Sequence, residues 1–347
     1  MFMLVFMRKL CQIIKLKGVE YSMKKNKIVR NLLISAATLV AIVALLLTAN
    51  AIYTAYEAHK YVKPGKMVET ENGMMHVYAN IKEDSEITYV FLTGLGGHSS
   101  YFEFKALREP LSENASVVTV DYLGYGMSEN TTAERSIANI ASEINTALVQ
   151  ADISGPYSFV VHSIGGYSAM AFTMAYPEKV ADLIFIDSSV PELIEYTEVE
   201  LLWILDQKRK TDFRRFTGLD RFDPPAPFLG LPPIPGLTPE EQRAAAFHNR
   251  KMAISSTVIN EINHTHENSE YLAGMQIPDS IPVLMLLSQI TDDLSVELGF
   301  PKTWRESHEQ RMNNNPKSEL IMFDAGHMLH RETPEEVLEA IKVFHKY

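Results

Sequence analysis

The feature that most constrains this chain is a stretch without a charged side chain, residues 31–56, whose centre at 32–47 is almost wholly apolar. A helix needs about 20 residues to cross the hydrocarbon core of a bilayer, so this run is long enough to span one. Basic residues precede the run and Glu57 follows it, so the positive-inside rule places its start in the cytoplasm. The sequence therefore predicts an N-terminal transmembrane helix and an exported domain behind it.

Two other interpretations of this run remain open. Ala49-Asn50-Ala51 has the small-x-small pattern of a signal-peptidase site, so cleavage after Ala51 would give a secreted protein. A buried core helix is the second alternative, although such helices seldom stay uncharged over this length. Because the apolar run is long, we expect a single-pass anchor in the cell membrane rather than a cleaved signal.

Charge and composition exclude several classes of protein. The net charge of the chain is −11, yet the first 56 residues carry eight basic side chains and one acidic, which leaves 24 basic and 42 acidic for residues 57–347. Such an acidic domain repels polyanions, so no nucleic-acid partner is expected. With 46% hydrophobic residues the chain is a folded protein, and its single cysteine, Cys11, excludes an intramolecular disulfide and a cysteine-built metal site.

In the exported part, strand-like apolar runs alternate with segments of helical length. This alternation favours βαβ units and an α/β fold with a mostly parallel sheet. Asn72-Gly73 is a strong signal for a hairpin between the first two strands. The expected strands are 67–70, 74–78, 87–92, 116–120, 157–161, 183–186, 282–287 and 319–323, and the clearest helices are 137–151 and 165–176.

One interval does not fit this alternation. About ninety residues, 190–280, separate two strands, far more than an ordinary connection. Helical patterns at 192–215 and 238–260 flank a proline-rich stretch at 224–235, which predicts a cap or lid over one end of the sheet. The expected organisation is a cytoplasmic N-terminus (1–30), a transmembrane or signal segment (31–56), a core in two parts (57–189 and 281–347) and the cap (190–280).

Ser163 lies between an apolar strand and a helix, in the run Val160-Val161-His162-Ser163-Ile164-Gly165-Gly166. A sharp strand-to-helix turn lifts a hydroxyl clear of the sheet, with the positive end of the helix beneath it. The full pattern is Gly-x-Ser-x-Gly, which asks for small residues two before and two after the serine. Gly165 meets it and Val161 does not, so the match is partial.

Three further segments follow strands and complete a constellation. Thr93-Gly94-Leu95-Gly96-Gly97 could offer backbone N–H groups to an oxyanion. Asp121-Tyr122-Leu123-Gly124-Tyr125-Gly126 follows the next strand as a glycine-punctuated loop. Asp324-Ala325-Gly326-His327 follows the last strand, where a histidine can reach a serine as general base.

With these four segments in this order, the chain resembles the α/β-hydrolase-fold serine hydrolases with a helical cap, over residues 67–347. The resemblance implies an eight-stranded, mostly parallel sheet with helices on both faces and the cap after the sixth strand. It also implies Ser163 as nucleophile, His327 as base, and Leu95 and Ile164 as oxyanion N–H donors, with no cofactor and no metal. The family usually has His-Gly where this chain has Thr93-Gly94.

The third member of a catalytic triad has two candidate positions. The resembled family most often carries the acid after the seventh strand, where this chain has Asp292 and Asp293. A minority carries it after the sixth strand, where this chain has Asp187. We expect Asp187, because it directly ends an apolar strand and is thereby well positioned.

The other histidines receive less specific interpretations. His98 and His162 are expected to support the site as polar neighbours, and His330, three residues after His327, is expected on an outer face. His264-Thr265-His266-Glu267 could suggest a metal, yet it lacks the helical His-Glu-x-x-His arrangement, so no metal site is expected.

The implied activity is cleavage of a small-molecule ester or amide through an acyl-enzyme, with a carboxylesterase or lipase as the expected type. Two alternatives remain: an aminopeptidase resembling the proline iminopeptidases, and a catalytically idle binding protein with the same fold. The peptidase alternative would need acids in the cap, for which Glu192, Glu195, Glu198 and Glu200 are candidates. A haloalkane dehalogenase is disfavoured, because that chemistry needs a carboxylate where this chain has Ser163.

Overall fold

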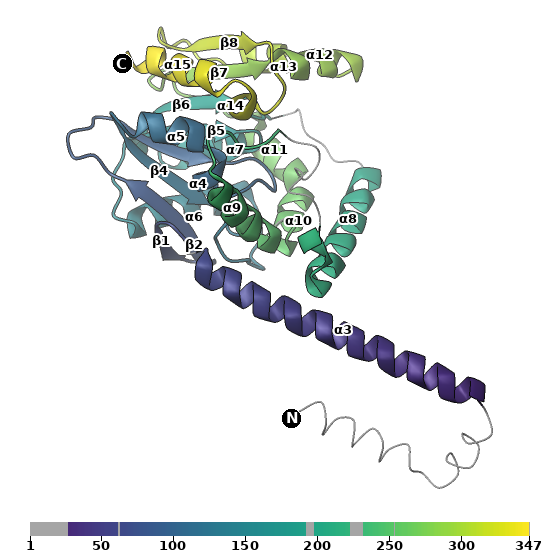
Figure 1. The fold of residues 1–347 in the computed structure, drawn as a ribbon. Helices are drawn as coiled ribbons and strands as arrows, with labels where there is room; N and C mark the ends of the chain where they lie inside the picture. The colour runs from purple at the N-terminus through teal and green to yellow at the C-terminus, as the bar shows by residue number, and fades with distance from the viewer. Residues whose placement is uncertain (1–26, 62, 192–197, 223–231, 253, 347) are drawn as a thin grey trace. The chain divides into compact units, whose positions relative to one another are not determined.

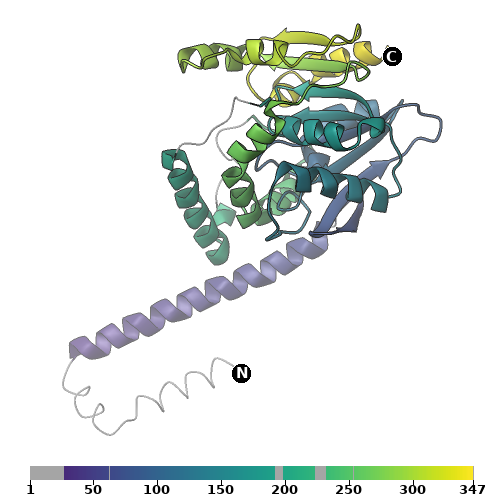
Figure 2. The same ribbon diagram turned by 180° about the vertical axis from the view of Figure 1, so that it is seen from behind.

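The computed structural model describes residues 27–346 except 62, 192–197, 223–231 and 253. The chain divides into two compact units, Met1–Lys60 with Asp212–Phe222, and Tyr61–Thr211 with Asp223–Tyr347. Figures 1 and 2 show the elements of both units from opposite sides.

The first unit is dominated by one long helix, α3 (Lys27–Lys60). Its part from Val29 to Lys60 is long and apolar enough to cross a membrane, and the most apolar window has none of its residues buried. The alternative of a buried core helix is therefore wrong. The unit also contains the end of α8 (Glu198–Thr217) and the short 3₁₀ helix η2 (Leu219–Phe222).

The second unit is built on an eight-stranded sheet with the order β1-β2-β4-β3-β5-β6-β7-β8. β2 pairs antiparallel with β1 and β4, and the strands from β4 onward in this order run parallel. Thr70 and Gly73 face each other across the predicted Asn72-Gly73 turn. The predicted mostly parallel sheet is confirmed; its strands are β1 (Lys66–Thr70), β2 (Gly73–Asn80), β3 (Thr88–Leu92), β4 (Ser116–Asp121), β5 (Tyr157–His162), β6 (Val180–Ile186), β7 (Val283–Ser288) and β8 (Glu319–Phe323).

Helices cover both faces of this sheet (Figures 1 and 2). Side chains alternate along the central strands, so Val90 of β3 belongs to the core under α6 and α7, and Phe91 to the core under α5 and α15. Strands buried on both faces explain why their sequences read as continuous apolar runs. The helices packed on the sheet or at its ends are α4 (Ser100–Glu103), α5 (Lys105–Leu111), α6 (Ile137–Gln150), α7 (Gly165–Ala175), η1 (Pro177–Lys179), α12 (Gln289–Glu297), α13 (Trp304–Glu309), α14 (Leu329–Glu332) and α15 (Pro334–His345).

The described part of the interval between β6 and β7 contains the helices α8, α9 (Pro239–Met252), α10 (Ser256–Asn263) and α11 (Thr265–Ala273). The single helix expected at 238–260 is in fact two, because Ile254 has a φ of +49° that no helix accommodates. Ser255 then caps α10 by accepting a hydrogen bond from Val258 N–H.

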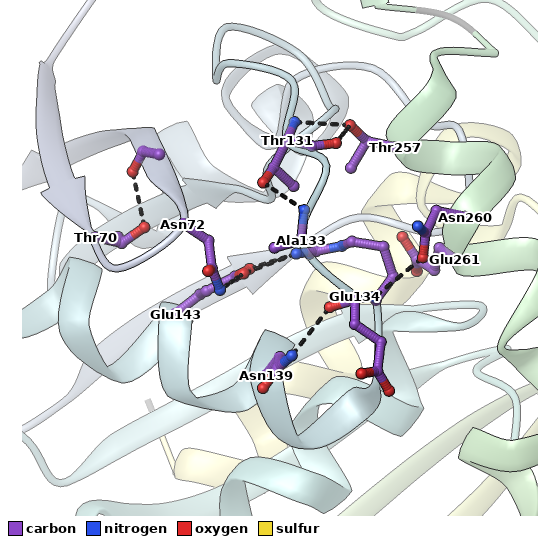
Figure 3. A network of polar contacts seen from close by, with 12 residues as sticks. Thr70, Asn72, Thr131, Ala133, Glu134, Asn139, Glu143, Thr257, Asn260 and Glu261 are labelled. Atoms are coloured by element: carbon purple, nitrogen blue, oxygen red, sulfur yellow. Dashed lines mark hydrogen bonds and ion pairs between the residues drawn. The ribbon is translucent and has the colours of Figure 1, made fainter.

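The second half of this helical interval is tied to the core by a polar network (Figure 3). The hydroxyl of Thr257 on α10 accepts from the Thr131 N–H at 2.9 Å and donates to its carbonyl at 3.0 Å. Asn260, one turn on, accepts from the Arg135 N–H at 3.1 Å. The fully buried Arg135 guanidinium donates to Glu143 at 2.8 Å. These bonds fix α10 against the loop that precedes α6.

Candidate active site

Ser163, Asp187 and His327 all follow carboxyl ends of parallel strands. Ser163 comes directly after β5 and Asp187 directly after β6, and these two strands are neighbours. His327 lies four residues after β8. Ser163 has a φ of +54° and Asp187 a φ of +41°, a region that residues with a Cβ seldom adopt. Such strained backbone is typical of functional sites.

The turn at Ser163 explains the departure from the usual glycine pattern. A Cβ built on Gly165 would lie 3.1 Å from the carbonyl oxygens of Leu92 and Thr93, but 3.5 Å from the Val161 Cβ. Position 165 must therefore stay small because the end of β3 passes over it, whereas the valine at 161 causes no clash. Val161 is fully buried in the sheet, so it adds packing that a glycine would lack.

The loop after β3 passes against the candidate nucleophile. A Cβ on Gly94 would lie 2.7 Å from the Ser163 Cβ and 3.3 Å from its Oγ, so only glycine permits this approach. Gly97 N–H donates to the Gly94 carbonyl at 3.1 Å and closes the loop around Leu95. Ile164, the other predicted oxyanion position, follows the serine and is the N-cap of α7.

Asp187 and His327 are joined by a short hydrogen bond. Nδ1 of His327 lies 2.7 Å from Oδ2 of Asp187, whose side chain is fully buried. The same oxygen accepts from the Thr291 hydroxyl at 2.8 Å, while Oδ1 accepts from the Ser288 N–H at 2.9 Å and the Trp304 indole N–H at 2.8 Å. Four donors, including His327 itself, fix the position of the carboxylate. The carboxylate in turn holds the imidazole through Nδ1, and Nε2 is the other ring nitrogen.

The structure does not bring the alternative acids to His327. Asp292 accepts from the backbone N–H of Arg305 at 2.8 Å, and Asp293 accepts from the Gln289 side chain at 2.8 Å. Both belong to α12 and its immediate surroundings. Of the three candidate carboxylates, Asp187 is therefore the one in position to orient the histidine.

A cluster of buried polar side chains lies behind His327. Nε2 of His162 is 3.0 Å from the His327 carbonyl oxygen, and the His162 ring centroid is 4.6 Å from those of both His327 and His330. Nε2 of His330 lies 2.6 Å from Glu103, which also pairs with Arg331 at 2.6 Å. His162 thus supports His327 as predicted for a polar neighbour of the site.

The prediction that His330 lies on an outer face is wrong, because the side chain is buried with 1% of its surface exposed. Residues Leu329–Glu332 form α14, a helix that sequence reasoning did not anticipate. That turn directs His330 inward onto Glu103 of α4. The partner lies 227 residues earlier in the chain, so no local pattern could have identified it.

In this cluster the histidines are neutral, and Glu103 forms an ion pair with Arg331. Burial lowers the pKa of His162 well below its usual value and also lowers the pKa of His330 and of His98. Burial alone would raise the pKa of the Glu103 carboxyl, but the hydrogen bond from His330 and the hydrogen bond and charge of Arg331 bring it well below its usual range. A neutral His162 then donates Nε2–H to the backbone of His327 and steadies it.

The remaining predicted candidates are the glutamates of the cap and the histidine segment that begins at His264. Glu192 and Glu195 lie outside the described residues, as do the side chains of Glu198 and Glu200. Nδ1 of His264 lies 2.7 Å from the Asn260 carbonyl of its own helical segment. Over the described part of the chain, no group of three or more His, Cys, Asp or Glu side chains is placed to hold a metal ion.

Sequence reasoning did not identify the side chains that hold Asp187. Thr291 and Trp304 come from segments 104 and 117 residues later in the chain, so their proximity depends on the pairing of β6 with β7. The threonine is unexceptional in sequence, and the tryptophan reads as core.

Comparison with known proteins gives a consistent result. The sequence profile of the alpha/beta hydrolase family matches residues 89–340. An uncharacterized protein of Bacillus subtilis strain 168, YbdG, is 26% identical over 269 residues, covering 75% of this chain and 80% of that protein. Epoxide hydrolase A from Mycobacterium thermoresistibile superposes with a TM-score of 0.59 at 20% identity, covering 81% of this chain and 97% of its own. A thermophilic esterase from Thermogutta terrifontis has a TM-score of 0.54 at 19% identity, covering 82% and 98%.

Proposed function

Because this chain belongs to the alpha/beta hydrolase family, we propose that it is a serine hydrolase that cleaves an ester or amide through an acyl-enzyme. The observation that carries the proposal is the 2.7 Å bond between His327 and the buried Asp187, beside a strained turn that presents Ser163. Family membership supports a hydrolytic enzyme, and these three residues give that enzyme a nucleophile, a base and an orienting acid.

The proposed mechanism follows the usual roles of such residues. His327 Nε2 takes the proton of the Ser163 hydroxyl as its Oγ attacks the substrate carbonyl, and Asp187 stabilises the imidazolium that forms. The N–H groups of Leu95 and Ile164 stabilise the oxyanion. His327 then protonates the leaving alcohol or amine, and a water activated by the same histidine hydrolyses the acyl-enzyme.

Epoxide opening is a poorer fit to this site, although an epoxide hydrolase shares its fold. Attack of a serine oxygen on an epoxide carbon would give an ether, which water does not cleave under general-base catalysis. Attack on an acyl carbon gives an ester, which it does. The serine at position 163 therefore favours carboxylesterase or lipase chemistry, with the aminopeptidase and the idle binding protein as alternatives.

We also propose that α3 anchors the enzyme in the membrane with residues 57–347 on the extracytoplasmic side. The uncharged run at 31–56, its basic N-terminal flank and the exposed apolar surface of α3 support this topology.

A serine-directed fluorophosphonate probe tests the hydrolase proposal. The full-length chain should be labelled, Ser163→Ala should abolish labelling, and Ser112→Ala, at the far end of α5, should leave it intact. A folded wild-type chain that takes no label and hydrolyses no substrate would support the idle binding protein. Panels of acyl esters and aminoacyl amides then separate esterase from aminopeptidase.

A further inference from the structure

Part of the helical interval between β6 and β7 belongs to the same unit as α3, and we call this part, Asp212–Phe222, the docking segment. It contacts the C-terminal portion of α3 through specific hydrogen bonds. Asn50 Nδ2 donates to the carbonyls of Arg215 at 2.8 Å and Phe216 at 3.2 Å, and Asn50 Oδ1 accepts from Arg221 Nε at 2.9 Å. A Cβ on Gly218, whose φ is +76°, would lie 2.9 Å from the Asn50 side chain.

Arg221 makes the remaining contacts of this junction. Its guanidinium donates to Glu57 at 2.5 Å and to the Thr54 hydroxyl at 2.6 Å, and it lies 4.5 Å from the centroid of the Tyr53 ring. One arginine therefore contacts four residues over two turns of α3, which fixes the docking segment to a defined stretch of that helix.

The position of this stretch along α3 sets its depth in a bilayer. A helix rises 1.5 Å per residue, so a hydrocarbon core of about 30 Å that begins just after Arg30 ends near Asn50. Tyr53 and Tyr56, both about half exposed, then lie where aromatic side chains gather at the membrane–water interface. The docking segment, which binds the Asn50–Glu57 stretch, lies at the same level.

The composition of the docking segment suits that level. Phe213, Phe216 and Phe222 are 62%, 65% and 81% exposed, whereas phenylalanine side chains are usually buried away from water. The same eleven residues include three arginines and two aspartates, which gives the segment a small positive net charge in a domain that is otherwise strongly acidic. Exposed aromatic rings together with basic side chains are typical of elements that lie in the interface of an anionic bilayer.

We propose that the docking segment is an interfacial anchor, whose phenylalanines insert into the headgroup boundary of an anionic phospholipid bilayer. The proposal rests on the proposed membrane anchoring through α3. It also requires that the chain is not cleaved after Ala51, because that cleavage would remove Asn50. The bilayer would then hold part of the cap at the surface where amphiphilic esters reside.

The test uses the full-length chain in vesicles of phosphatidylcholine and phosphatidylglycerol. Cys11→Ser removes the native thiol, and an environment-sensitive fluorophore is attached at Phe222→Cys or, as a control at another exposed position, at Val343→Cys on α15. Spin-labelled lipids should quench the fluorophore at position 222 at least about threefold more than at position 343. Adding Phe213→Ser and Phe216→Ser to the Phe222→Cys chain should remove most of that difference.

Equal quenching at the two positions, in a chain that floats with the vesicles, would overturn the interfacial anchor and leave the membrane anchor intact. A chain that does not float with the vesicles would overturn both. Fluorophosphonate labelling of each variant separately reports whether the hydrolase domain is folded and whether the proposed serine chemistry holds.

Discussion

At the level of single residues, the triad acid gives the sharpest test. Asp187→Asn keeps the shape of the side chain but removes the charge that holds and stabilises the His327 imidazole, so we expect kcat to fall by about 10⁴. Asp292→Asn and Asp293→Asn, whose carboxylates bond elsewhere, should each lose less than about tenfold. Steady-state kinetics on a chromogenic ester measure all three. A large loss of kcat in either control variant would mean that the triad acid lies on α12 instead.

His327 and His330 are three residues apart and should respond in different ways. His327→Ala should lower kcat/KM by several orders of magnitude with the melting temperature nearly unchanged, because its ring is 40% exposed. His330→Ala removes a buried partner of Glu103, so it should cost about 1–3 kcal/mol of unfolding free energy. We expect its kcat/KM, measured on the folded fraction, to stay within about tenfold. Equal losses of kcat/KM in the two variants would mean that His327 has been wrongly assigned as the base.

His248 on α9 predicts part of the pH dependence of stability. Burial lowers its pKa to about 4, with Lys63 lowering it further and Asp121 opposing. The unfolded chain takes up a proton below about pH 6.5 that the folded chain does not, so stability falls as the pH drops from 6.5 towards 4. His248→Phe, which places an apolar ring beside Phe102, should reduce the loss of melting temperature between pH 7 and 5. Parallel curves for the two proteins would contradict this assignment.

At the level of elements, substitutions on either side of the β5–α7 turn should affect different properties: stability at position 161 and activity at position 165. Val161→Gly leaves a hole in a buried strand and should cost about 3 kcal/mol of unfolding free energy without raising kcat. Gly165→Ala places a methyl 3.1 Å from the carbonyls that end β3, so the loop around Leu95 must move and kcat should fall about tenfold or more. Denaturant unfolding and esterase kinetics on both variants separate the two effects. A rise in kcat for Val161→Gly would mean that the valine distorts the turn.

The elements differ in how far sequence could predict them. The central strands were predictable because they are continuous apolar runs buried on both faces, as in β7. The first two strands are only partly buried, and the Asn72-Gly73 turn between them located that pair. The break at Ile254 and the short α14 were not, because a residue other than glycine adopts a positive φ in one case and tertiary packing bends the chain in the other. The turn at Ser163 followed from a local motif. The surroundings of Asp187 did not, since its partners come from distant segments.

At the level of the whole molecule, topology is the prediction that matters most. The full-length chain should stay in the membrane fraction after alkaline carbonate washing, and protease added to intact spheroplasts should digest residues 57–347. The reason is the uncharged run of α3 with its basic flank, which resists translocation of the N-terminus. A product that begins at residue 52 and is found in the medium would instead establish a cleaved signal peptide. A full-length chain soluble in the cytoplasm would contradict both the membrane anchor and the cleaved signal.

The bond between Asp187 and His327 joins residues that are 140 positions apart, and the other groups that hold the carboxylate follow it by 101 to 117. At synthesis rates of about 5–20 residues per second, the serine leaves the ribosome roughly 8–33 seconds before the histidine does. During that time the growing chain carries the proposed nucleophile without the proposed base. If the proposed triad holds, a chain that ends before the final strand has no competent hydrolytic centre, and activity reports that translation has passed His327.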